Sequence, residues 1–141
     1  MKKGRILALD VGTKRIGVAV SDEWQWTAQP LTVIKRKTDE RVLKTIANLA
    51  EEQGAVKIVV GLPVTLRGET GQAAKEVLGF VEKLKERLSV PIITWDEALT
   101  TAEAEEILLE ADLSRKRRKQ VIDKLAAALI LESYLRATAE N

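Results

Sequence analysis

Three carboxylate residues occupy positions where acidic side chains could act together on a substrate. Asp10 ends the apolar run Arg5–Asp10, and Glu97 follows the apolar run Val90–Trp95. Asp123 falls on the apolar stripe of a predicted helix near the end of the chain. A carboxylate on such a stripe is costly to desolvate unless a cation or a hydrogen-bond donor meets it. Three such acids in one place would bind a hard cation through oxygen ligands alone.

Composition restricts the chemistry further. The chain has 141 residues with no Cys and no His. This excludes zinc sites built on thiolate or imidazole, Cys nucleophiles, Ser-His-Asp triads and haem bound through His or Cys. An oxygen-only site suits Mg²⁺ or Mn²⁺, and two such ions could activate water and stabilise the leaving oxygen of a phosphodiester.

Each acid also has a structural interpretation. Asp10 could simply begin a turn, and Glu97 could be a solvated loop residue. Asp123 could be a buried aspartate whose hydrogen bonds are satisfied within the fold. The catalytic interpretation requires that the first and fifth strands end at one crevice, because open α/β sheets place their sites at the carboxyl ends of parallel strands.

Basic residues cluster near the last of these acids. A run of five begins the predicted final helix, one turn before Asp123, and two more follow the first strand. The residues are Lys14, Arg15, Arg115, Lys116, Arg117, Arg118 and Lys119. Such patches attract a phosphate backbone, so we expect them to bind nucleic acid, although a solvated helix face is the alternative.

Two further features are open to more than one interpretation. Trp24 and Trp26 could stack on bases, but we expect them to cover the edge of the core. The loop Gly61–Gly71 could close over substrate or could be a plain crossover, and it lacks the P-loop pattern.

The elements that must position these residues follow from hydrophobic periodicity. We predict strands at 5–10, 15–21, 28–34, 56–60 and 90–95, and helices at 38–53, 73–88, 100–110 and 114–137. Pro30 places the third strand near an edge, and the second helix is predicted to bury Leu78. The order predicts an α/β fold: a mixed five-stranded sheet with three antiparallel strands and then parallel strands, flanked by helices.

Charge and hydropathy bear on location. The net charge is +2, and no apolar run approaches the roughly 20 residues that a membrane span needs. The N-terminal apolar run is too short for a signal-peptide core. We therefore expect a cytoplasmic protein without membrane contact.

Four motifs, in order along nearly the whole chain, resemble the YqgF/RuvX family of Holliday-junction resolvases and pre-16S rRNA nucleases. The matching residues are Asp10-Val11-Gly12 with Arg15-Ile16-Gly17-Val18-Ala19 and Ser21-Asp22, Gly61-Leu62-Pro63 with Gly68, Asp96-Glu97 with Leu99-Thr100-Thr101 and Glu103-Ala104, and Lys119 with Val121-Ile122-Asp123, Ala126-Ala127 and Ile130-Leu131. The chain departs from the family at Ala98, where Arg is usual, and at Thr65 and Arg67, where Asn and Asp or Asn are common.

The resemblance implies an RNase H-like fold and a single nuclease domain spanning residues 1–141. It also implies that Asp10, Glu97 and Asp123 are catalytic, metal-binding acids that hold Mg²⁺ or Mn²⁺, with two ions expected. The implied function is 5′-end processing of precursor 16S rRNA. The alternative substrate is a four-way DNA junction. The oligomeric state is left open between monomer and homodimer, because a symmetric junction would favour a two-fold dimer.

Two rival functions have sequence features that separate them from this one. The actin and sugar-kinase fold also begins with an Asp-x-Gly-[Ser/Thr] loop, but it needs two domains to enclose a nucleotide, and 141 residues are too few. A nucleic-acid-binding module without catalysis would not need all three acids.

Overall fold

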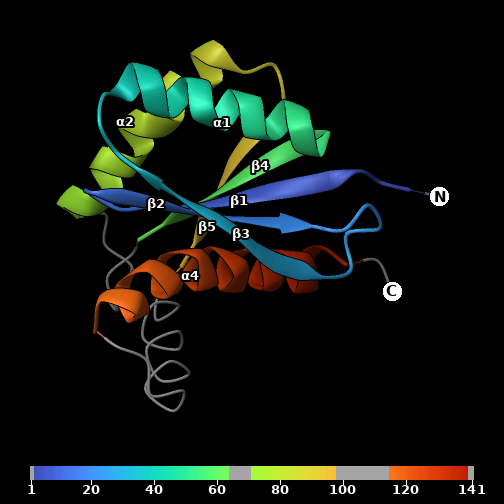
Figure 1. Ribbon diagram of the computed structural model, residues 1–141. Helices are drawn as coiled ribbons and strands as arrows, with labels where there is room; N and C mark the ends of the chain where they lie inside the picture. Colours follow the sequence, from blue (N-terminus) through green and yellow to red (C-terminus); the bar gives the residue numbers. More distant parts are fainter. Residues whose placement is uncertain (1, 64–70, 98–114, 140–141) are drawn as a thin grey trace.

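The computed structural model describes residues 2–63, 71–97 and 115–139, which form a sheet of five strands with helices on both faces (Figure 1). The elements are β1 (Arg5–Val11), β2 (Arg15–Ser21), β3 (Ala28–Lys35), α1 (Asp39–Gln53), β4 (Ala55–Leu62), α2 (Gln72–Arg87), β5 (Ile92–Asp96) and α4 (Arg115–Thr138). The predicted helix at 100–110 and the residues Thr65, Arg67 and Ala98 lie outside this description.

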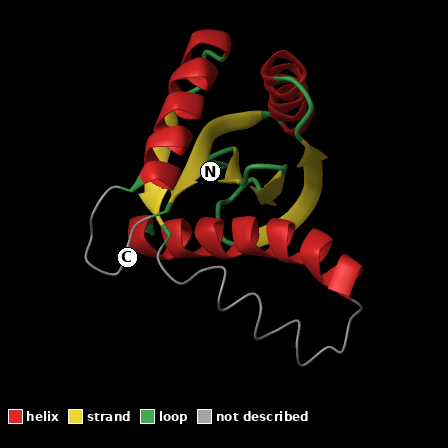
Figure 2. Ribbon diagram, turned by 90° about the vertical axis from the view of Figure 1, so that its left-hand side faces the viewer, coloured by secondary structure: helices red, strands yellow, loops and turns green. Residues whose placement is uncertain are grey.

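The sheet has the strand order β3-β2-β1-β4-β5. β1, β2 and β3 form an antiparallel meander, and β4 and β5 run parallel to β1. Helices α1 and α2 cover one face and α4 covers the other (Figure 2). The predicted mixed sheet is therefore confirmed, as is the edge position of the strand that contains Pro30. None of the helices that the structure describes is long and apolar enough to cross a membrane.

Strand alternation divides the core into two layers. Leu7 and Leu9 of β1 pack on the side of α1 and α2, whereas Ile6 and Ala8 pack on the side of α4. This follows from the geometry of a strand, in which successive side chains point to opposite faces. Asp10 continues the Ile6 and Ala8 series and so belongs to the α4 face.

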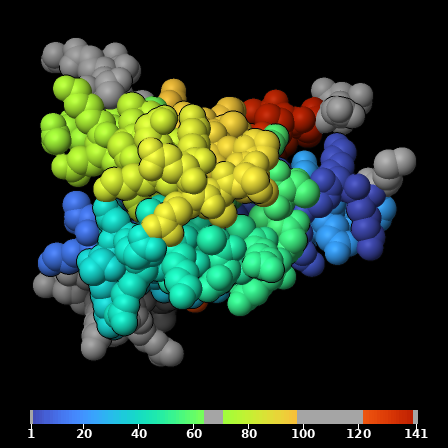
Figure 3. Space-filling model, turned by 90° about the horizontal axis from the view of Figure 1, so that it is seen from above, coloured from blue at the N-terminus to red at the C-terminus, as the bar shows by residue number. Residues whose placement is uncertain are grey.

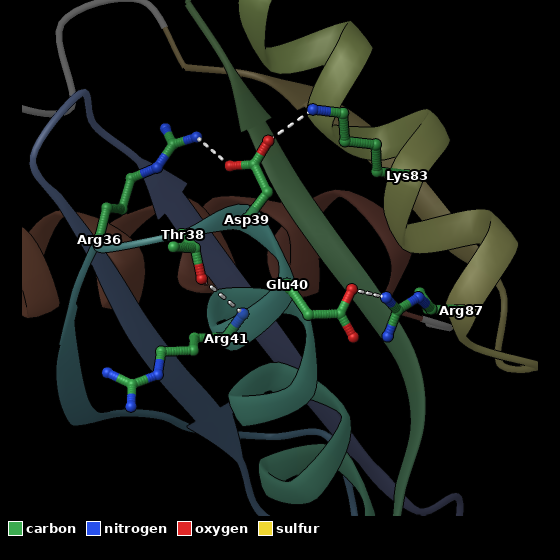
Figure 4. Close-up of polar contacts among 7 residues, drawn as sticks. All are labelled: Arg36, Thr38, Asp39, Glu40, Arg41, Lys83 and Arg87. Carbon is green, nitrogen blue, oxygen red and sulfur yellow. Dashed lines mark hydrogen bonds and ion pairs between the residues drawn. The ribbon is translucent and has the colours of Figure 1, made fainter.

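The two helices of the first layer lie side by side and are joined by ion pairs (Figure 3). Asp39, in the first turn of α1, accepts hydrogen bonds from Lys83 of α2 at 2.5 Å and from Arg36 at 3.4 Å (Figure 4). Arg87 of α2 pairs in the same way with Glu40. Acidic residues in the first turn of α1 also complement the helix dipole.

Side-chain interactions explain where α1 begins and ends. The Thr38 hydroxyl accepts a hydrogen bond from the Arg41 backbone N–H, which caps the N-terminus (Figure 4). Gly54 has φ 62° and donates its N–H to carbonyls of the last turn. Glycine adopts this left-handed conformation at low cost, so the chain can turn directly into β4.

Two sequence predictions about apolar side chains are wrong. Leu78 is 39% exposed, and Phe80 is buried in its place on the inward face of α2. Trp24 and Trp26 do not cover the core, because they are 39% and 78% exposed and stack on each other with ring centroids 5.8 Å apart. The Asp22 carboxylate fixes their turn by accepting hydrogen bonds from three backbone N–H groups, those of Trp24, Trp26 and Thr27.

Candidate functional site

Three parallel strands bring their carboxyl ends to one edge of the sheet. Asp10 lies near the end of β1, and Glu97 comes directly after β5. The Glu97 backbone N–H donates to the Leu62 carbonyl at 3.1 Å, which ties Glu97 to the end of β4. β2 runs antiparallel and therefore begins at the same edge, with Arg15. Open α/β folds place their sites at such an edge.

Gly61 of β4 leaves the space that the Glu97 side chain occupies. A Cβ on Gly61 would lie 2.9 Å from Glu97 Oε2 and 2.5 Å from Ile130 Cδ1 of α4. The Glu97 carboxylate therefore lies over β4, between the sheet and α4. Its Oε2 atom is buried and has no hydrogen-bond partner among the residues that the structure describes. An unpaired carboxylate oxygen in such a place is costly unless a cation or donor meets it.

Gly17 of β2 leaves space for the backbone of α4 to approach the sheet. A Cβ on Gly17 would lie only 1.8 Å from the Asp123 carbonyl oxygen, so helix and strand are in direct backbone contact here. Gly17 is also the cross-strand partner of Asp10, and cross-strand partners share a face of the sheet. This contact brings Asp123 beside Asp10, although more than one hundred residues separate them in the chain.

Burial and mutual repulsion perturb two of these acids. Burial, and then the nearby charge of Asp123, raise the pKa of Asp10 to about 6, and a hydrogen bond with Glu97 acts in the opposite direction. Burial, and then the charge of Asp10, raise the pKa of Glu97 to about 8. The two carboxylates thus share a proton near neutral pH, as buried acid pairs do.

Asp123 has a different partner. Arg15 Nε donates to Asp123 Oδ2 at 2.5 Å, and the two side chains are 31% and 21% exposed. Among the described residues, no group of three acidic side chains is arranged to hold a metal ion directly. Asp10 and Glu97 are paired with each other, and Asp123 adjoins them but is engaged by Arg15.

Of the basic residues predicted to bind nucleic acid, the structure describes the side chains of two. Arg15 lies inside the site against Asp123, while Lys14 is exposed on the adjoining turn. The residues Arg115, Lys116, Arg117, Arg118 and Lys119 form the first turns of α4, and their side chains lie outside the described part of the chain. Their binding role stays a prediction.

The donor set fits a divalent cation. It consists only of carboxylate oxygens, one of them buried without a partner, and two of the acids are held with raised pKa values. Hard ions such as Mg²⁺ and Mn²⁺ prefer these ligands. A cation would offset the burial and the repulsion that raise the pKa of both Asp10 and Glu97.

The sequence did not predict the role of two glycines in this site, nor the contact that Arg15 makes within it. Gly17 and Gly61 make room for Asp123 and Glu97, and Arg15 neutralises Asp123 instead of extending toward solvent. Each glycine interrupts a β-rich run on the same face as an acid, which is a signal for close approach of another segment.

The metal-free protein is expected to lose stability as pH rises. Both acids have folded-state pKa values above their ordinary ones, so each stabilises the fold at low pH, and this contribution is lost as pH rises through the folded value. The loss falls between about pH 4 and pH 8, given pKa values of about 6 for Asp10 and about 8 for Glu97.

Thermal unfolding in chelator, over a pH series, measures this loss. We expect Glu97→Gln to melt several degrees above the wild type at roughly pH 8.5 and close to it at roughly pH 4, because the neutral amide avoids ionisation of a buried acid. Equal melting temperatures for the two proteins at the higher pH would contradict the prediction.

The family model described as RuvX, Holliday junction resolvase, matches residues 4–137. A protein of Desulforudis audaxviator named "Putative pre-16S rRNA nuclease" is 50% identical over 131 residues, which cover 93% of each chain. One of Thermoanaerobacter pseudethanolicus with the same name is 52% identical over 132 residues, covering 93% of this chain and 95% of that protein.

Solved structures show the same fold at low sequence identity. RuvC of T. thermophilus, in complex with a Holliday junction substrate, has a TM-score of 0.60 and 18% identity and covers 98% of both chains. The fowlpox virus resolvase in complex with Holliday junction DNA has a TM-score of 0.57 and 9% identity, covering 96% of this chain and 99% of the resolvase. The fold is thus RNase H-like, as these resolvases are.

Proposed function

We propose that this chain, which belongs to the RuvX family of Holliday junction resolvases, is a divalent-metal-dependent nuclease that hydrolyses phosphodiester bonds in structured nucleic acid. One observation carries the proposal: Asp10 and Glu97 form a buried acid pair with an unpartnered oxygen, and Asp123 adjoins the pair. Residues 1–141 would act as a single nuclease domain.

Asp10, Glu97 and Asp123 would hold the cations, which we propose to be Mg²⁺ or Mn²⁺, two in number. When bound, the ions would supply activation of a water nucleophile and stabilisation of the charge that develops on the phosphate and the leaving oxygen. Asp10 would act together with both neighbours, because it adjoins both Glu97 and Asp123. Glu97 would release its shared proton as the site fills, and its buried Oε2 would gain a partner.

The basic residues would hold the substrate. Asp123 would leave Arg15 on binding a cation, and the Arg15 guanidinium would then be free to contact the phosphate. Lys14 and the run 115–119 would contact the phosphate backbone on either side, which positions the nucleic acid without reading its sequence.

The names of the relatives favour precursor 16S rRNA as substrate. We propose that its 5′ end is processed, which would place the activity in the cytoplasm. The family description favours a four-way DNA junction as the alternative.

A cleavage assay of the purified protein with Mg²⁺ or Mn²⁺ on both substrates tests the proposal. Cleavage of precursor rRNA supports the first, and cleavage of junctions by a two-fold dimer supports the second. Binding of both without cleavage would overturn the nuclease and favour a binding module.

Arg15→Gln is expected to bind Mn²⁺ about fivefold more tightly than the wild type while the metal-free protein becomes less stable. Arg15 competes with a cation for Asp123, and its removal leaves that carboxylate unneutralised beside Asp10. The effect is modest, because the pair is partly solvated. Calorimetric titration and thermal unfolding measure the two changes.

The matched control for this substitution is Lys14→Gln, which removes a charge from the neighbouring exposed side chain. It should change the Mn²⁺ affinity less than twofold. An Arg15→Gln protein with unchanged or weaker Mn²⁺ binding would show that Arg15 does not compete for the site.

A further inference from the structure

A cleft of about 390 Å³ opens at the sheet edge, beside Glu97. It lies between the β1–β2 turn, the end of β4 and the first turns of α2, and its walls include Thr13, Arg36, Pro63, Ala73, Glu76 and Val77. Glu97 also lines this cleft, so a molecule bound there would lie against one member of the acidic pair. The carboxyl ends of β1 and β4 meet at this point, where the chain order of the sheet changes direction, a common ligand position in α/β folds.

Arg36 is held in place at the cleft wall. Its Nη1 donates to the Gly12 carbonyl at 2.8 Å, and its Nη2 donates to Asp39 at 3.4 Å. The guanidinium also lies over the Phe80 ring, 5.3 Å from the centroid, and Lys83 holds Asp39 in turn (Figure 4). Arginine carries five N–H donors, of which these contacts use two. A fixed guanidinium beside an acidic site is suited to a phosphate.

The other walls suit a base. Val11 also lines the cleft, and Val11 and Pro63 are half-buried and give apolar surface against which a ring can pack. The Glu76 carboxylate can accept hydrogen bonds from an exocyclic amino group. The volume is at the lower end of small-ligand pockets, which fits one nucleotide and is too small for a duplex.

We propose that this cleft binds one unpaired nucleotide that adjoins the bond to be cleaved, with its phosphate on Arg36 and its base against Val11 and Pro63. The inference rests on the proposed nuclease function and adds that the substrate must present a nucleotide outside a duplex at the cutting site. A strand end or a loop in RNA meets this requirement, as does an opened base pair at a branch point.

Binding of a short fluorescent single-stranded RNA to the Asp10→Asn protein tests the cleft separately from cleavage. Ala73 is exposed and lines the cleft, so Ala73→Trp fills the cleft without disturbing the core. The control is Gly79→Trp on the same helix, where a side chain meets open space. We expect Ala73→Trp to weaken binding about tenfold or more, as loss of one packed base does, and Gly79→Trp to change it less than twofold. Thermal unfolding checks that both variants are folded.

A second pair of variants tests the cleft without the bulky Trp side chain, which could weaken RNA binding indirectly. Glu76→Gln keeps the shape of the cleft, and Glu82→Gln removes a charge elsewhere on α2. Oligo(A) and oligo(C) should bind more tightly than oligo(U), whose base lacks an amino group. The Glu76→Gln substitution should reduce this difference in affinity, and Glu82→Gln should leave it unchanged. Equal binding by the Ala73→Trp and Gly79→Trp proteins would overturn the subsite. If the wild type cleaves nothing yet Ala73→Trp weakens binding, the subsite stands and the nuclease proposal fails.

Discussion

Asp10→Asn is expected to reduce phosphodiester cleavage by a factor of about 10³ or more. Asp10 is the acid that adjoins both of the others: it shares a hydrogen bond with Glu97, and the charge of Asp123 raises its pKa. Asn has the same shape but lacks the charge that would hold a cation. The rate of product formation at saturating Mg²⁺ or Mn²⁺ measures the effect.

The stability of the same variant separates lost chemistry from lost structure. Burial already raises the pKa of Asp10, so a neutral side chain should leave the metal-free protein as stable as the wild type or more so. The control Glu51→Gln removes an exposed carboxylate on α1, and its rate should stay within about twofold of the wild type. Undiminished cleavage by Asp10→Asn would remove Asp10 from the catalytic site.

Gly17→Ala is expected to destabilise the protein by about 3 kcal/mol or more and to abolish cleavage. A Cβ at this position would lie 1.8 Å from the Asp123 carbonyl oxygen, so α4 must move away from β2. The helix carries Asp123 and buried residues such as Ala127 and Ile130, and displacement would disturb both the site and the core. Urea unfolding and the cleavage assay measure the two effects.

Gly79→Ala is the matched control for this substitution. Gly79 lies within α2, where a new Cβ meets nothing within 4 Å. Alanine has the higher helix propensity, so this variant should be equally stable or more stable by up to about 1 kcal/mol. A Gly17→Ala protein that matched Gly79→Ala in stability and activity would show that close contact between α4 and β2 is not required.

The positions of Asp10 and Glu97 could be predicted from the sequence because successive side chains of a strand point to opposite faces of the sheet. Asp10 continues the series of Ile6 and Ala8, and Glu97 continues that of Ile93 and Trp95, all on the α4 face. Parallel pairing of β1, β4 and β5 then brings the strand ends together. The pattern therefore predicted both the face and the edge of the sheet where these acids lie.

The partner of Asp123 could not be read in this way. Arg15 and Asp123 are 108 residues apart in the chain. Their contact depends on the position of α4 along β2. That register is set by the direct contact at Gly17 and by small side chains such as Ala19 and Ala127 at the interface. A linear pattern of charges carries no information on this register, so Arg15 was assigned to nucleic-acid binding alone.

The exposure of three apolar side chains could not be predicted from their spacing in the sequence. Spacing placed Leu78 on the inward face of α2, but Phe80 is buried there instead and packs beneath Arg36. Likewise, Trp24 and Trp26 were expected to cover the edge of the core, yet hydrogen bonds to Asp22 hold them in a turn where both rings are exposed. Packing partners and turn geometry, which periodicity does not contain, decided both outcomes.

Locating Mn²⁺ by anomalous scattering in crystals of the wild-type protein tests most directly whether these acids form one metal site. We expect an anomalous peak bounded by Asp10, Glu97 Oε2 and Asp123, with Asp123 released from Arg15. A structure at saturating Mn²⁺ that kept the Arg15–Asp123 pair and showed no peak among the three carboxylates would contradict it.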